Sequence, residues 1–290
     1  MKKIIALMLI LALSVFAFAA CGGSDDDDTT PAEKTYSLAL AVDTTIDGAK
    51  VTNYVTTLVL DDANKIVAVR IDCVEATATL ENGAVANVAS VASKVEQGDN
   101  YAMNSGSFAK QVKAFEDAIV GKTADEVANL DMSLVAGCTM PYSPYSFKAV
   151  VAKAFASTNK TTFKTADSFT LGLANDMSIS VGKATTYYAG TVVAGGKIVA
   201  TIIDCGEVTL TVADGAITGT YAGTKVEQGD NYAMNSGSFA KQTEAFENAI
   251  AGKTATEVTN LDMSLVAGCT MPYSPASFKA VVVESITNAR

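Results

Sequence analysis

A short corner of small residues that ends in threonine occurs twice in the chain, as Ala136–Thr139 and as Ala267–Thr270. Both copies have the sequence Ala-Gly-Cys-Thr. A glycine allows the backbone to approach a ligand closely, and N–H groups near the start of a helix can hold a phosphate. The candidate binding residues at this corner are Gly137, Thr139, Gly268 and Thr270. A tight bend that only leads into a helix remains the open alternative.

A second candidate is the polar segment Lys94–Gln111, which recurs without change as Lys225–Gln242. It combines an aromatic and a sulfur side chain with several polar ones, a mixture suited to lining a flat ligand such as a flavin. The residues proposed for this role are Asp99, Tyr101 and Met103, with Asp230, Tyr232 and Met234 in the second copy. The alternative is a loop whose side chains cap the backbone at a helix start.

The composition excludes several kinds of chemistry. The chain has no histidine, which excludes Ser-His-Asp and Cys-His nucleophilic sites and histidine ligands for zinc or haem. Its formal net charge of −10 argues against a nucleic-acid partner, because neutralising the many phosphates of a nucleic acid needs a basic surface. No spacing among the carboxylates singles out an acid–base pair. The sequence therefore predicts no catalytic residue and no metal site.

The cysteines divide into Cys21 near the N-terminus and two in each half of the chain, which are Cys73 and Cys138, then Cys205 and Cys269. In an exported protein, an even number of cysteines per domain predicts one disulfide in each. Buried reduced thiols, which pack as small hydrophobic side chains, are the open alternative.

Residues 1–20 have the features of a secretory signal. Two lysines precede the apolar run Ile4–Ala20, and the end of the run resembles a bacterial lipobox, Phe18-Ala19-Ala20-Cys21. We expect cleavage before Cys21 and lipidation of its thiol, which would anchor the chain at the extracytoplasmic face of the cell membrane. A plainly secreted chain and an uncleaved anchor are the alternatives. Residues 21–34, which include four consecutive aspartates, are expected to be an acidic tether.

The remainder of the chain is one unit written twice. Lys94–Val151 and Lys225–Val282 differ at 7 of 58 positions, at an offset of 225 − 94 = 131 residues, and the segments before them match more loosely. A period of this length is too long for a solenoid repeat. We expect two similar domains, at 35–157 and 167–290, joined by a short polar linker around Ser157–Thr162.

Each unit begins with segments typical of strands. In the first unit these are Tyr36–Val42, Val51–Leu60 and Lys65–Asp72. Asn82-Gly83 and Asp214-Gly215 predict tight hairpin turns, which require positive φ at both central residues. The first of these turns is expected to join strands at 74–81 and 84–91.

Helices are expected to follow the strands. Phe108, Val112, Phe115 and Ile119 fall on one helical face, Thr123 to Glu126 forms a capping box, and Ser143-Pro144 marks another helix start. The predicted fold class is α+β: two similar domains, each an antiparallel sheet with two or three helices covering one face.

Each unit resembles the FMN-binding domain of bacterial lipoproteins and respiratory flavoproteins. The resemblance rests on the strand segments Lys65–Asp72 and Gly196–Asp204 and on the Ala-Gly-Cys-Thr corner, where the family has Ser-Gly-Ala-Thr. It implies that FMN is the cofactor and that a flavin transferase esterifies it to Thr139 and Thr270. A redox partner is also implied.

The expected function is therefore that of a lipid-anchored flavin carrier of electrons outside the cytoplasm. The alternative is a non-redox surface module that binds a solute, polymer or protein partner through two near-identical faces. A flavin-binding or other binding role is favoured over a turnover enzyme, since no base stands out to activate a nucleophile.

Overall fold

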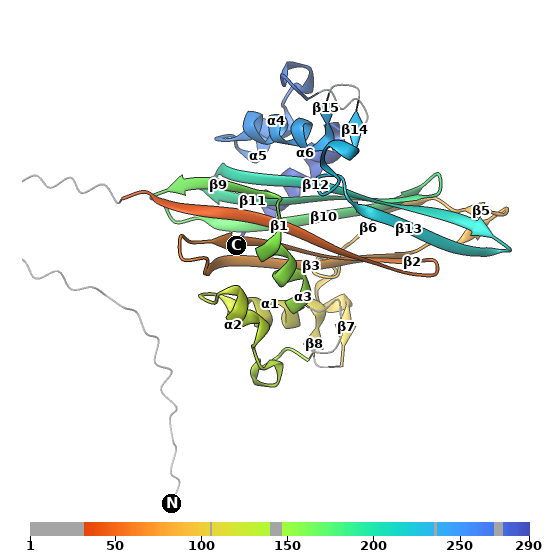
Figure 1. Ribbon diagram of the computed structural model, residues 1–290, viewed down its shortest axis with the longest axis horizontal. Coiled ribbons are helices and arrows are strands. Elements are labelled where there is room, and N and C mark those ends of the chain that lie inside the picture. Colours follow the sequence, from red (N-terminus) through yellow and green to blue (C-terminus); the bar gives the residue numbers. More distant parts are fainter. Residues whose placement is uncertain (1–31, 105, 140–146, 235–236, 270–274) are drawn as a thin grey trace, which may run out of the picture. The chain divides into compact units, whose positions relative to one another are not determined.

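The computed structural model describes residues 32–104, 106–139, 147–234, 237–269 and 275–290. Two antiparallel sheets lie face to face, and helices cover the outer face of each (Figure 1). The expected class, α+β with antiparallel sheets, is confirmed. The expected signal, Cys21 and most of the tether lie outside the described residues.

The first sheet has the strand order β3-β2-β1-β9. Its strands are β1 (Lys34–Asp47), β2 (Lys50–Leu60), β3 (Ile66–Thr77) and β9 (Lys160–Thr165). The first two contain the strands predicted from the sequence, and β3 contains the third except for Lys65. The fourth overlaps the expected linker: it pairs antiparallel with β1, and Phe163 lies opposite Tyr36.

The second sheet has the order β13-β12-β11-β10-β6. Its strands are β10 (Thr170–Ser180), β11 (Lys183–Ala194), β12 (Lys197–Ala213), β13 (Ala216–Thr224) and β6 (Val88–Val91). Strand β6 comes from the first half of the chain but pairs with β10, so the expected hairpin of 74–81 with 84–91 is wrong in extent. Only β4 (Leu80–Glu81) and β5 (Ala84–Val85) pair across the Asn82-Gly83 turn, where both φ angles are positive as predicted.

Three helices cover the outer face of each sheet. They are α1 (Phe108–Ile119), α2 (Ala124–Ala128) and α3 (Phe147–Ala156), then α4 (Phe239–Ile250), α5 (Ala255–Thr259) and α6 (Pro275–Thr287). The predicted face of α1 is buried, and the capping box at Thr123 is present with both of its hydrogen bonds. The predicted helix start at Ser143-Pro144 lies outside the described residues.

Short elements lead into the first helix of each half. They are the 3-10 turns Gly98–Asn100 and Gly229–Asn231 and the two-residue strands β7 (Ala102–Met103), β8 (Gly106–Ser107), β14 (Ala233–Met234) and β15 (Gly237–Ser238). The Ser107 side chain accepts a hydrogen bond from the Lys110 N–H and caps α1.

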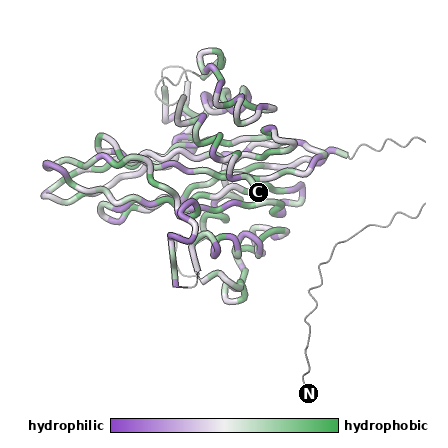
Figure 2. The backbone as a smooth tube through the Cα atoms, turned by 180° about the vertical axis from the view of Figure 1, so that it is seen from behind, coloured by the Kyte–Doolittle hydropathy of each residue, from purple (hydrophilic) through white to green (hydrophobic). Residues whose placement is uncertain are grey.

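The two halves share a hydrophobic core between the sheets. Leu38, Leu40 and Val55 from the first sheet pack in one cluster with Leu171 and Tyr188 from the second. The central strands accordingly carry many apolar residues (Figure 2). Each sheet is thus covered on both faces, whereas the sequence predicted cover on one. The two-domain expectation is not confirmed, because residues 32–290 form one compact unit.

Two glycines show how closely the layers approach. A Cβ added at Gly190 would lie 2.1 Å from a side-chain carbon of Thr57 in the other sheet. A Cβ at Gly172 would lie 1.7 Å from the Ser285 carbonyl oxygen of α6. Real Cβ atoms do not make contacts this short, so only glycine permits this spacing.

Candidate functional site

The threonine corner of the first half follows a 3-10 turn, Met132–Leu134. The Asp131 side chain caps this turn by accepting hydrogen bonds from the Ser133 N–H (2.9 Å) and hydroxyl (2.7 Å), which hold the pKa of Asp131 below its usual value. Gly137 has a φ of +83°, a left-handed conformation that side chains other than glycine rarely adopt. The corner is therefore a defined bend and not an extended segment.

Gln111 holds this corner to helix α1, and the sequence analysis missed it. Its Oε1 atom accepts hydrogen bonds from both the Thr139 N–H (2.8 Å) and the Thr139 hydroxyl (2.9 Å). Its Nε2 atom points to the Met103 sulfur at 3.7 Å, and the glutamine is fully buried. The sequence offered one signal for this residue, namely a polar glutamine on the apolar face of the predicted helix, next to Val112.

A hollow of about 600 Å³ opens beside the corner. Its walls are formed by Asp131, Met132, Ser133, Val135, Ala136, Gly137, Cys138 and Thr139. Thr139 is an exposed residue that lines the hollow, and Gln111 orients its hydroxyl. The volume is in the range of small-molecule sites, but the hollow is more open to solvent than such sites usually are.

The second copy repeats this geometry as far as the described residues reach. Gly268 also has a φ of +83°, and the Gln242 amide lies 3.6 Å from the Met234 sulfur. Thr270 lies outside the described residues, so the expected equivalence of the two hydroxyls is untested.

The other candidates do not line the hollow. Asp99 is exposed and pairs with Lys110 at 2.9 Å, and that hydrogen bond lowers the pKa of Asp99. The Tyr101 hydroxyl donates to Glu75 at 3.2 Å. Of the three residues proposed from this segment, Met103 alone approaches the corner, through Gln111. The second copy agrees: Asp230 pairs with Lys241 at 3.6 Å, and the Tyr232 hydroxyl donates to Glu207 at 3.4 Å.

Tyr101 instead belongs to a buried cluster around Lys94. The Lys94 ammonium lies 2.8 Å from Glu75 and 4.7 Å from the centroid of the Tyr101 ring. Burial alone would lower the pKa of Lys94, but the hydrogen bond and the negative charge of Glu75 raise it, so the ammonium stays charged. Lys225, Glu207 and Tyr232 repeat the cluster. Its ion pair and ring contact give it a structural role.

The four cysteines of the two halves are buried, and no disulfide joins them. Burial raises the pKa of the Cys73 and Cys205 thiols to about 12, which keeps them protonated and unreactive. The predicted disulfides are absent, in agreement with the alternative of buried thiols that pack in the apolar clusters behind each sheet.

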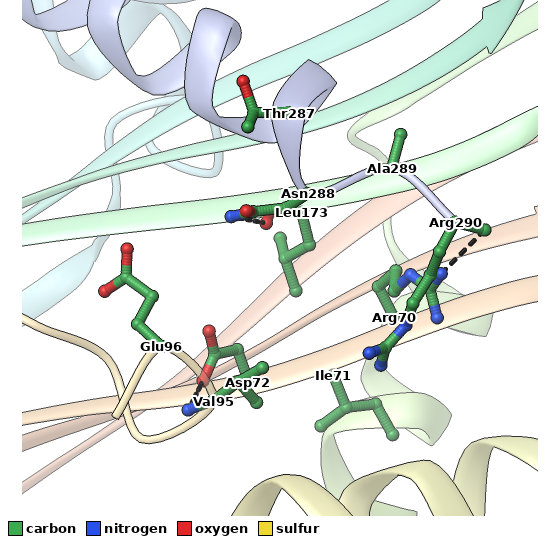
Figure 3. A pocket seen from close by; sticks show the side chains of 10 residues that line it. All are labelled: Arg70, Ile71, Asp72, Val95, Glu96, Leu173, Thr287, Asn288, Ala289 and Arg290. Carbon is green, nitrogen blue, oxygen red and sulfur yellow. Dashed lines mark hydrogen bonds between the residues drawn. The ribbon is translucent and has the colours of Figure 1, made fainter. Parts of the chain in front are cut away.

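A smaller cavity, of about 380 Å³, lies where the C-terminal end of α6 meets β3 (Figure 3). Arg70 and Arg290 lie at one side of it, and Asp72 and Glu96 at the other. The Asp72 carboxylate accepts from the Cys73 and Val95 N–H groups and from the Asn175 amide. Burial nevertheless raises the pKa of Asp72 to about 6.

Comparisons with protein-family models, with curated proteins and with solved structures found no match to this chain. Across the part of the chain that the structure describes, no helix combines the length and apolar character needed to cross a membrane. The same residues contain no group of three or more cysteine or acidic side chains placed to hold a metal ion.

Proposed function

We propose that the chain binds a flavin, FMN, at the corner that ends in Thr139 and carries electrons outside the cytoplasm. The observation that supports the proposal is Thr139, an exposed residue that lines a hollow of about 600 Å³ and whose hydroxyl is held by Gln111. The second copy, with Gly268 and Thr270, is proposed to act in the same way, as part of a chain built from two similar domains.

The residues around the hollow fit a flavin in part. Met132, Val135 and Cys138 offer apolar surface to a flat ring, and none of the described residues that line the hollow is a lysine or arginine. A phosphate would therefore be held through an ester to Thr139 better than through an ion pair, in agreement with covalent attachment by a flavin transferase. When bound, the flavin would supply the redox chemistry.

The chain's own contribution is position. Gln111 accepts a hydrogen bond of 2.9 Å from the Thr139 hydroxyl, which fixes the orientation of that group. The second bond from Gln111, to the Thr139 N–H, fixes the backbone at the same place. We therefore propose Gln111 as the residue that presents the hydroxyl for attachment.

The test is co-expression of residues 22–290 with an FMN transferase. We expect a yellow protein whose fluorescence survives denaturation in a gel, and a Thr139→Ala, Thr270→Ala double variant that loses it. Ser133→Ala is the matched control, because it removes another hydroxyl at the same hollow, and it should keep the colour. Fluorescence retained by the double variant would contradict attachment at these threonines.

A second candidate function is a non-redox binding module, and the exposed leucines favour it. Leu134 and Leu265 occupy equivalent positions in the 3-10 turns Met132–Leu134 and Met263–Leu265, and each residue is 79% exposed. Two equal apolar points would raise the avidity for a repeating partner. A colourless protein that also ignores added FMN would favour this function over the first.

The proposed location is the extracytoplasmic face of the cell membrane, through a lipid on Cys21. Incorporation of a labelled fatty acid into the chain, lost in Cys21→Ala, is the expected result. A chain that stays unlabelled and is released to the medium would contradict the anchor.

A further inference from the structure

An ion pair holds helix α3 to the second half of the chain. The Lys153 ammonium lies 3.2 Å from Glu227, and it also donates to the Val42 carbonyl oxygen. Glu227 belongs to the turn 224–228, where it also accepts the Thr224 N–H at 2.9 Å. The contact thus joins a helix of one half to the turn that begins the polar segment of the other.

The equivalent contact, between α6 and the turn 93–97, has a carboxyl group on each side. Glu284 on α6 corresponds to Lys153, since 284 − 153 = 131, and Glu96 corresponds to Glu227, since 227 − 96 = 131. Glu96 lines the cavity of Figure 3 together with Thr287, which lies three residues after Glu284 on α6. This placement brings the Glu96 and Glu284 carboxyl groups close enough to interact. Two carboxyl groups can share a hydrogen bond only when one of them carries a proton.

Acidic groups also face this contact from the neighbouring strands. After burial and Glu96, the strongest influences on Glu284 are Asp176 on β10 and Asp72 on β3. Together they raise the pKa of Glu284 to about 8. The two guanidinium groups across the cavity in Figure 3 are both bonded to Glu116, at 3.2 Å for Arg70 and 3.1 Å for Arg290.

We propose that the contact between Glu284 and Glu96 is a proton-dependent latch. When one carboxyl is protonated, the latch holds α6 to the turn 93–97. When both are ionised, the like charges repel and the latch opens. The Lys153–Glu227 contact stays closed over the same pH range, because an ammonium and a carboxylate attract each other throughout it.

The sign of the pH effect follows from the raised pKa. A carboxyl whose pKa is higher in the folded chain than its ordinary 4.5 gives its full stabilisation below pH 4.5. That stabilisation is lost as the pH rises toward 8. Because Glu284 is only partly buried, water screens the effect, and we expect a modest change.

The first experiment compares melting temperatures of the full chain between pH 6 and pH 9. Wild type should lose about 2–4 °C more than Glu284→Gln over this interval. Glu284→Lys, which copies the Lys153–Glu227 pair, should likewise lack the additional decrease in melting temperature that wild type shows. Lys153→Glu, the matched control, places two carboxyl groups at the other contact. Its melting temperature should therefore fall more than that of wild type between pH 6 and pH 9. Equal pH slopes in wild type and Glu284→Gln would overturn the proposal.

A second experiment locates the change within the chain by hydrogen exchange. Peptides that begin before Lys94 and Lys225 cover the identical segments but differ in mass, because the preceding residues differ. Relative to intrinsic rates, exchange in 93–97 should speed up between pH 6 and pH 9, while exchange in 224–228 should not. Equal behaviour of the two turns would overturn the latch and would leave the flavin proposal unaffected.

Discussion

Glu116 and Glu247 occupy the same position on α1 and α4, and their surroundings differ in charge. Each accepts a backbone N–H from the sheet below, from Ile71 at 2.8 Å or from Ile203 at 2.7 Å. Glu116 also pairs with Arg70, whereas the position equivalent to Arg70 is Ile202. Burial, with repulsion from Asp204, raises the pKa of Glu247 to about 8.

We predict that Glu247→Gln stabilises the chain at alkaline pH. The folded-state pKa of about 8 lies above the ordinary 4.5, so stability from this group is full below pH 4.5 and is lost as the pH rises to 8. Glutamine can still accept the Ile203 N–H and has no charge to bury. Above pH 8 the free energy of unfolding of the variant should exceed that of wild type by at least about 1.4 kcal/mol, measured by urea unfolding.

The matched variant is Glu116→Gln, which should destabilise the chain, although burial raises the pKa of Glu116 as well. It leaves the largely buried Arg70 without its charged partner, at a cost of about 3–5 kcal/mol. A Glu247→Gln variant less stable than wild type at pH 9 would contradict this account of the pair.

Gln111 provides the next prediction, at the candidate site. Replacement by leucine keeps the volume but leaves the Thr139 N–H without its acceptor, so the free energy of unfolding should fall by about 1–3 kcal/mol. Met103→Leu is the control, and it should cost less than about 1.5 kcal/mol because it removes only a weak sulfur contact. Equal losses in the two variants would argue against a specific role for the glutamine.

Strand β9 is the element where the structure departs most from the sequence prediction. Ser157–Thr162 is polar and short, which is typical of a linker, but Phe163 follows it and packs against two other rings. The centroid of the Phe163 ring lies 5.5 Å from that of Tyr36 and 5.7 Å from that of Phe169. The segment is thus an edge strand that completes the first sheet.

We predict that Phe163→Ala destabilises the chain by about 3–5 kcal/mol, because it removes a buried ring from the core between the sheets. Chemical unfolding would measure the loss. Lys164→Ala, one residue on and exposed in the same strand, should change stability by less than about 0.5 kcal/mol. A neutral Phe163→Ala would show that the segment is a linker after all.

Local sequence patterns predicted where helices, strands and turns lie better than they predicted which strands pair with each other. The spacing of apolar residues located α1, and the Asn82-Gly83 pair located a turn, because both signals come from neighbouring residues. The pairing of β6 with β10 joins residues far apart in the chain, and no local pattern specifies it. The bend before Thr139 was located from its Ala-Gly-Cys-Thr pattern, and its binding role stays a prediction. Gln111 was missed because its role depends on tertiary contact.

At the scale of the whole molecule, the repeat does not give two independent bodies. The hydrophobic cluster between the sheets contains residues from both halves of the chain. Strand β6, from the first half, is an edge strand of the second sheet, and β9, which follows α3, is an edge strand of the first. Neither half could bury its inner sheet face alone. The helical outer layers, with the two candidate corners, are thereby held on opposite faces of one core (Figure 1).

We therefore predict that residues 32–290 unfold in a single cooperative transition. The calorimetric and van't Hoff enthalpies should agree, as expected for a two-state unit. The fragment 32–157 expressed alone should aggregate or remain unfolded, because its inner sheet face would be exposed. Two separated transitions in the intact chain would contradict the shared core.

The central functional claim is that Thr139 is a docking point for a flavin, and a peptide map tests it most directly. The peptides that contain Thr139 and Thr270 differ in mass when they extend to Tyr145 and Ala276. After co-expression with an FMN transferase, we predict that the Thr139 peptide carries the mass of FMN less one water. An unmodified Thr139 peptide, from a chain that also fails to bind free FMN, would contradict the claim.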